Sequence, residues 1–146
     1  MTNSSFPIIV ENQTDLGDLA AVLNWLDAEA NTIKRNLKTE GAVLFRGFPI
    51  VTAEDFDAFS AAFGYQDFTY KESLSNAVRI NFTPRVFTAN EAPPDVEIFL
   101  HHEMAQTPIS PEKLFFCCLS AAESGGATPL CRSDLLYAAF KERHPE

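Results

Sequence analysis

Apolar residues recur at helical spacing along the first part of the chain. Between about Asp15 and Thr39 they lie three or four positions apart, which is the spacing of one face of a helix. The positions on this face are Leu16, Leu19, Ala20, Leu23, Leu26, Ala30, Ile33 and Leu37. Thr14 is suited to cap the N-terminus and Gly41 to end the helix. The pattern therefore predicts one long amphipathic helix.

A short strand and a second helix are expected next. The run from Ala42 to Phe45 is apolar and is followed by turn residues, as is typical of a buried strand. Thr52 can cap the following helix, whose first turn carries acidic residues that suit the helix dipole. Phe56, Phe59 and Phe63 line one face of this helix, which predicts that they pack in the core.

The pattern then changes to one typical of β-structure. Short apolar segments alternate with turn residues, and the stretch EAPPD cannot lie inside a helix because of its prolines. The predicted strands are 68–71, 77–82, 85–88, 96–103 and 113–120, the last buried on both faces. Ser133 can cap a last helix with apolar positions at Leu135, Leu136, Ala139 and Phe140. Helices followed by many short strands indicate an α+β fold with a β-sandwich or barrel core.

Composition and charge exclude several classes of function. The 146 residues fit one domain, and a net charge of −9 argues against a nucleic-acid partner. No apolar run is long enough to span a membrane, and the N-terminal residues do not form a signal peptide. Cys117, Cys118 and Cys131 are expected to be buried free thiols of a reducing compartment. We therefore expect a cytoplasmic protein with no membrane partner.

The segment FLHHEM carries the clearest candidate chemistry. On a strand, side chains alternate between faces, so His101 and Glu103 would share one face and His102 the other. A histidine and a carboxylate are two of the three ligands in the facial triad that holds non-haem Fe(II). Two alternatives remain at this point: a polar strand end without a ligand, and a zinc site, although structural zinc requires four ligands.

Several blocks in a fixed order resemble one known family. HHEM, KLFFCC and ESGGATPLCRSD, together with GAVLFRGFPI and VFTANEAPPDVEIF upstream, are similar to the TauD/TfdA family of Fe(II)/2-oxoglutarate-dependent oxygenases. The resemblance covers about residues 41–134. It is closest to the branch with glutamate in the metal motif, which includes clavaminate-synthase-like enzymes and amino-acid hydroxylases.

The resemblance implies a fold, cofactors and site residues. The fold would be a double-stranded β-helix (jelly roll) with N-terminal helices. His101 and Glu103 match the first two iron ligands, and Thr128 matches the threonine that binds 2-oxoglutarate; no further catalytic residue is implied. The substrate would be an amino acid or a molecule derived from one, either free or tethered to a carrier protein. Without the resemblance, Thr128 would be taken as a strand residue after a Gly-Gly turn.

Two elements of the family pattern find no match in this sequence. The third iron ligand is a distal histidine on a late strand, and an arginine after it binds 2-oxoglutarate; His144, at the end of the last helix, does not match that position. Residues 1–146 are therefore expected to be the N-terminal portion of one such domain, with an incomplete barrel and an exposed apolar face. That face would favour pairing with a second copy or with a complementing chain. The alternative function is a truncated, non-catalytic remnant or interaction module.

Four further charged residues have two interpretations each. Arg46 is either an anion contact or part of a structural salt bridge, and Glu91 either reaches the mouth of the site or caps a turn. Arg79 and Arg85 either bind an acidic group of the substrate or are solvated.

Overall fold

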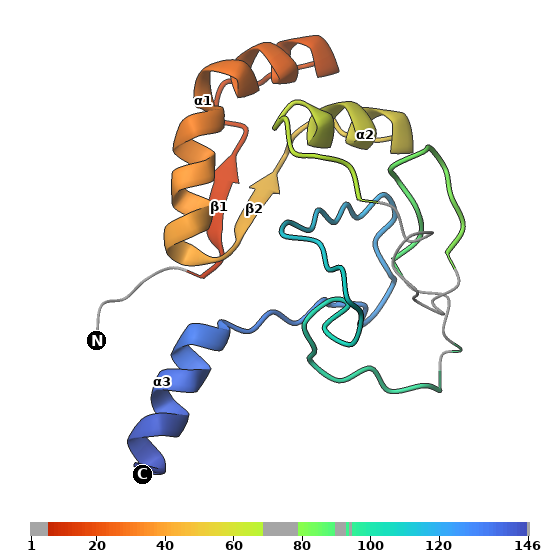
Figure 1. The fold of residues 1–146 in the computed structure, drawn as a ribbon. Coiled ribbons are helices and arrows are strands. Elements are labelled where there is room, and N and C mark those ends of the chain that lie inside the picture. Colours follow the sequence, from red (N-terminus) through yellow and green to blue (C-terminus); the bar gives the residue numbers. More distant parts are fainter. Residues whose placement is uncertain (1–5, 69–78, 90–92, 94, 146) are drawn as a thin grey trace.

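The N-terminal third of the chain forms a β-α-β unit. The computed structural model describes residues 6–68, 79–89, 93 and 95–145 (Figure 1). Its elements are β1 (Ile8–Glu11), α1 (Leu19–Glu40), β2 (Val43–Arg46), α2 (Ala53–Ala61) and α3 (Ser133–Arg143). Strands β1 and β2 are parallel, with Ile8 opposite Val43 and Glu11 opposite Arg46. Parallel neighbours need a crossover connection, which α1 supplies.

Helix α1 confirms the first predicted helix, with a different N-terminal cap. The Asp18 carboxylate accepts a hydrogen bond from the Ala21 amide at 2.8 Å, so Asp18 and not Thr14 is the cap. The preceding residues form a turn in which the Asn12 side chain bonds the backbone N–H and carbonyl of Leu16. Gly41 ends the helix as predicted. Its φ of 85° is a left-handed conformation that glycine adopts without strain.

Helix α2 completes the core. Thr52 and Asp55 form a capping box: the Thr52 hydroxyl accepts from the Asp55 amide, and the Asp55 carboxylate accepts from the Thr52 amide. Phe59 and Phe63 are buried, as predicted, whereas Phe56 is half-buried. The buried core residues are Val22, Leu26, Ile33, Phe59 and Phe63. These residues come from α1, α2 and the turn that follows α2, and Figure 1 shows both helices beside the two strands.

The predicted strands 96–103 and 113–120 are wrong. Both segments are irregular, and only an isolated bridge between Asn81 and Phe87 lies near the predicted strand 85–88. The prediction for 68–71 and 77–82 lies largely outside the described residues. A strand requires hydrogen bonds to a neighbour. The only strand ladder among the described residues joins β1 to β2. The α+β class is therefore confirmed, but the described residues do not form a double-stranded β-helix.

The chain exposes a large surface that includes many large hydrophobic side chains. The chain exposes 11448 Å², whereas a compact protein of this mass exposes roughly 7500 Å². Phe99 is 73% exposed and Phe116 61%, and no residue of α3 is buried. Cys118 and Cys131 are also exposed and Cys117 is half-buried, so the thiols are free but not buried as predicted. None of the described helices is long and apolar enough to cross a bilayer.

Candidate functional site

The side chains of His101 and Glu103 face each other. His101 Nε2 lies 3.6 Å from Glu103 Oε2, and His101 Nδ1 lies 2.7 Å from the Phe99 carbonyl oxygen. A carbonyl oxygen only accepts, so this contact places the proton on Nδ1. In the neutral ring the lone pair is then on Nε2, the atom that lies nearest Glu103. Histidines that bind metals are characteristically oriented by such a second hydrogen bond.

A turn, and not a strand, brings this pair together. The Ala105 amide donates to the His102 carbonyl at 3.2 Å, and the Thr107 amide donates to the Met104 carbonyl at 3.0 Å. Met104 is only 3% exposed and has a φ of 58°, so a buried side chain fixes an unusual backbone conformation at the centre of the turn. The expected grouping of His101 with Glu103 is present, but strand alternation is not its cause.

His102 points to a different element. Its Nε2 lies 2.7 Å from the hydroxyl of Ser133, the first residue of α3. Ser133 was expected to cap this helix, but the N-cap is Arg132 and no side chain caps it. The Ser133 hydroxyl is instead engaged by His102.

The His101–Glu103 pair fits two positions of a metal site. Two ligands at right angles, each about 2.1 Å from a metal, are about 3 Å apart. The observed 3.6 Å therefore needs only a small side-chain rotation. Among the described residues no group of three or more His, Cys, Asp or Glu side chains could hold a metal. The described part of the chain thus provides two donors for an iron site. Two donors are fewer than the four that structural zinc requires.

Glu103 also lines a hollow with a volume of about 760 Å³, which we call the α2 hollow. This volume suits a small molecule. Lining side chains come from α2, from residues 65–68 after it, from residues 79–89 and from residues 109–119; they include Phe56, Tyr65, Phe82, Arg85, Phe115 and Phe116. His101 is not part of the lining, so a metal held by the pair would lie at the border of the α2 hollow.

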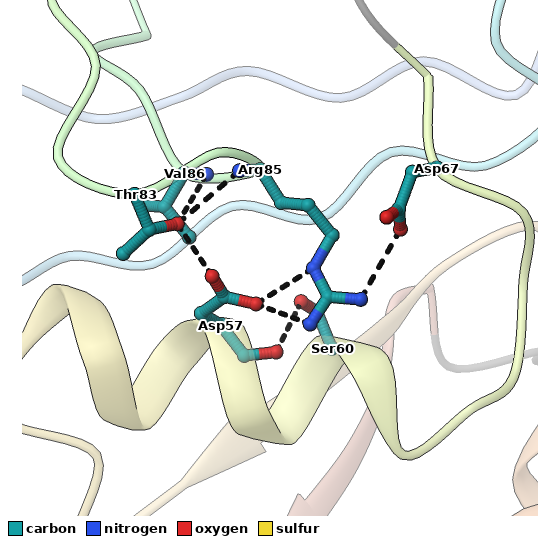
Figure 2. A network of polar contacts seen from close by, with 6 residues as sticks. All are labelled: Asp57, Ser60, Asp67, Thr83, Arg85 and Val86. Atoms are coloured by element: carbon teal, nitrogen blue, oxygen red, sulfur yellow. Dashed lines mark hydrogen bonds and ion pairs between the residues drawn. The ribbon is translucent and has the colours of Figure 1, made fainter.

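Arg85 is neutralised by two carboxylates at the wall of the α2 hollow (Figure 2). Its Nε donates to Asp57 Oδ1 at 2.7 Å, and its Nη1 lies 3.2 Å from Asp67 Oδ1. The Thr83 hydroxyl also donates to Asp57, and this bond, followed by the Arg85 bond, holds the pKa of Asp57 below its ordinary value. Arg85 therefore has a structural role, and neither interpretation made from the sequence included Asp57. No short-range sequence signal joins the two residues, because they are 28 positions apart.

Among the residues that the structure describes, no hydrogen bond or ion pair joins Thr128, Arg46 or His144 to the pair. Thr128 is exposed. Arg46 is exposed on β2, and Glu91 lies outside the described residues. The ring of His144 packs on Phe140 at a centroid distance of 4.8 Å near the end of α3.

Comparison with known proteins identifies the class. The family described as taurine catabolism dioxygenase TauD, TfdA family matches residues 8–146, and the chain belongs to it. Enzymes of this family typically use Fe(II) and 2-oxoglutarate and adopt a jelly-roll fold.

Two curated relatives are similar to the chain. A clavaminate synthase-like protein of Arabidopsis thaliana is 47% identical over 110 residues, which is 75% of this chain and 33% of the relative. The dapdiamide synthesis protein DdaC of Enterobacter agglomerans is 30% identical over 106 residues, 73% of this chain and 32% of that protein. The chain thus aligns with about a third of the length of each relative.

Proposed function

We propose that this chain carries the first two iron ligands of an Fe(II)/2-oxoglutarate-dependent dioxygenase. The observation that carries the proposal is the facing pair, with His101 Nε2 3.6 Å from Glu103 Oε2. The hydrogen bond from His101 Nδ1 to the Phe99 carbonyl supports it, because in the neutral ring it leaves the lone pair on Nε2 for a metal. Membership of the family favours iron over other metals, because enzymes of this family typically use Fe(II).

The site residues have separate roles in binding the metal and 2-oxoglutarate. His101 and Glu103 hold the metal at the border of the α2 hollow, and Thr128 binds a carboxylate of 2-oxoglutarate through its hydroxyl. Iron and 2-oxoglutarate, when bound, supply the oxygen chemistry with which such enzymes hydroxylate C–H bonds. The protein contributes binding and orientation, and the aromatic wall of the α2 hollow excludes water from the substrate.

We further propose an amino acid, or a molecule derived from one, as the substrate. The α2 hollow, at about 760 Å³, is large enough for such a molecule and combines aromatic with charged side chains. One relative is named for dapdiamide synthesis and another as clavaminate synthase-like, and the analogy extends to a substrate that is either free or carried on a carrier protein.

A second candidate function is a non-catalytic interaction module. It is favoured by the donor count, since the described residues provide two metal donors and no third. The exposed apolar surface also suits a module that binds further polypeptide.

An anaerobic titration with Fe(II) separates the two functions. We expect a visible charge-transfer band only when Fe(II) and 2-oxoglutarate are both present, and we expect His101→Ala to abolish it. His144→Ala is the matched control and should retain the band, because His144 lies on the far end of α3. A folded chain that gives no band, or that gives the same band after His101→Ala, would contradict the dioxygenase proposal for these residues.

A further inference from the structure

The segment that carries Thr128 has polar contacts with earlier parts of the chain at the start of α3. Among the described residues, these are two side-chain contacts. Arg132 pairs with Glu40 at the end of α1 at 3.3 Å, and Ser133 bonds His102 at 2.7 Å. The two residues are adjacent, so both polar contacts hold the segment at the start of α3.

The two contacts lead to different parts of the fold. Glu40 and Arg132 are both largely buried, with side chains 20% and 16% exposed, and this pair ties the segment to the β-α-β unit. The His102–Ser133 bond ties the same point to the turn that holds His101 and Glu103. His102 therefore connects the candidate iron ligands to the segment that carries Thr128.

We propose that His102 is a positioning residue: through Ser133 it sets where the Thr128 segment lies relative to the His101–Glu103 pair. Thr128 is five residues before Ser133, a span of at most about 17 Å. A displacement of Ser133 is therefore transmitted to Thr128 over a short length of chain. The role rests on the proposed function, because it concerns how 2-oxoglutarate meets the metal.

The Ser133 hydroxyl can be removed without disturbing the helix it begins. Arg132 is the N-cap and no side chain caps α3, so the Ser133 hydroxyl makes no capping hydrogen bond that the substitution would remove. Alanine is also the best helix former. The variant Ser133→Ala thus removes the His102 contact, Ser133→Thr retains a hydroxyl, and Ser120→Ala is the matched control at an exposed serine outside the helix.

Two measurements test the proposal. In the first, 2-oxoglutarate is titrated into the Fe(II)-loaded chain without oxygen, and Fe(II) binding is measured separately in its absence. Ser133→Ala and His102→Ala should each weaken 2-oxoglutarate binding roughly 2- to 10-fold, the range set by loss of one hydrogen bond. Fe(II) binding should change less than about 2-fold, and Ser133→Thr should restore the cosubstrate affinity. Equal losses for iron and cosubstrate, or no loss for either, would overturn the proposal.

The second measurement uses the metal-free chain, so that it does not depend on the proposed function. Hydrogen exchange at the amides of Ala105 and Leu136, which donate to the carbonyl oxygens of His102 and Arg132, should be faster in Ser133→Ala and in His102→Ala, and no faster in the double variant. Ser120→Ala should leave both amides unchanged. If exchange stays at the wild-type rate, His102 does not position this segment, whatever the iron titration gives. If exchange rises as expected but the wild-type chain gives no iron band, only the proposed function fails.

Discussion

Asp57 of α2 is joined to Arg85 by both donors of one guanidinium edge, across 28 residues of chain. The Asp57 side chain is 17% exposed and that of Arg85 is 32% exposed, so solvent screens this pair only in part. The same carboxylate accepts the Thr83 hydroxyl, whose oxygen in turn accepts the amides of Arg85 and Val86 (Figure 2). A single carboxylate on α2 thus fixes the turn at residues 83–86, which forms part of the wall of the α2 hollow.

Loss of the Asp57 carboxylate should therefore destabilise the fold. We expect Asp57→Ala to lower the free energy of unfolding by about 2 kcal/mol, since it leaves Arg85 and Thr83 without their shared acceptor. Asp67→Ala is the matched control: its side chain is 53% exposed, and its removal should cost less than about 0.5 kcal/mol. Urea denaturation measures both values. Equal losses for the two variants would show that the Asp57 contacts contribute no more than an exposed ion pair.

The same carboxylate gives stability a defined pH dependence. The pKa of Asp57 is held below its ordinary value of 3.8, first by the Thr83 hydrogen bond and then by Arg85. Because the unfolded chain then binds the proton more readily, this contribution is complete above pH 3.8 and is lost as the pH falls through the lower, folded value. The stability difference between the wild-type chain and Asp57→Asn should therefore narrow at low pH.

Thermal unfolding of both proteins between pH 7 and pH 2.5 checks this expectation. The pKa values of Asp55 and Asp134 are also lowered, but both groups are common to the two proteins, so the comparison isolates Asp57. A difference that stays constant across the range would show that the carboxylate does not contribute through its charge.

The cap of α1 gives a test between two nearby residues. Asp18→Ala should cost about 1 kcal/mol, because the Ala21 amide loses its acceptor. Thr14→Ala should change the free energy of unfolding by less than about 0.5 kcal/mol, since Thr14 lies within the turn that precedes the helix and does not cap the helix. Denaturant unfolding that gave the larger loss for Thr14→Ala would place the start of α1 earlier in the chain.

The exposed apolar surface should make the chain self-associate. Leu136 and Phe140 of α3 are each 62% exposed, and the double variant Leu136→Gln, Phe140→Gln keeps both the net charge and the helix propensity. Association measured by analytical ultracentrifugation should decrease in this variant, while the stability stays within about 0.5 kcal/mol. The control is Leu26→Ala in the core, which should cost about 3 kcal/mol. Unchanged association would show that α3 is not part of the surface through which the chain self-associates.

Local signals in the sequence were sufficient to predict α1, β2 and α2. The helix expected over residues 15–39 lies at Leu19–Glu40, and Gly41 and Thr52 mark boundaries as predicted, because caps and apolar periodicity act over one or two turns. Strand β1 was not predicted, since four residues at the start of a chain carry little periodic signal. The strands expected over 96–103 and 113–120 depended on partners far along the chain, and apolar content alone does not supply a partner.

At the candidate site, too, the sequence predicted the local grouping of residues but not the long-range contact. His101 and Glu103 were paired from their spacing, and their side chains do meet, but through a turn centred on the buried Met104. The contact between His102 and Ser133 spans 31 residues and could not be read from spacing. Thr128 was assigned from the family resemblance alone, and its role stays a prediction.

The most direct test of the central claim is an anaerobic titration of the ¹⁵N-labelled chain with Fe(II), following the ring resonances of its three histidines. We predict that the paramagnetic metal first broadens the signals of His101, and that those of His144 persist at the same metal concentration. Glu103→Gln should shift the effect to at least about tenfold higher Fe(II), as expected for loss of a metal ligand or its partner. Broadening of all three histidines together, or of His144 before His101, would contradict the assignment of His101 and Glu103 as iron ligands.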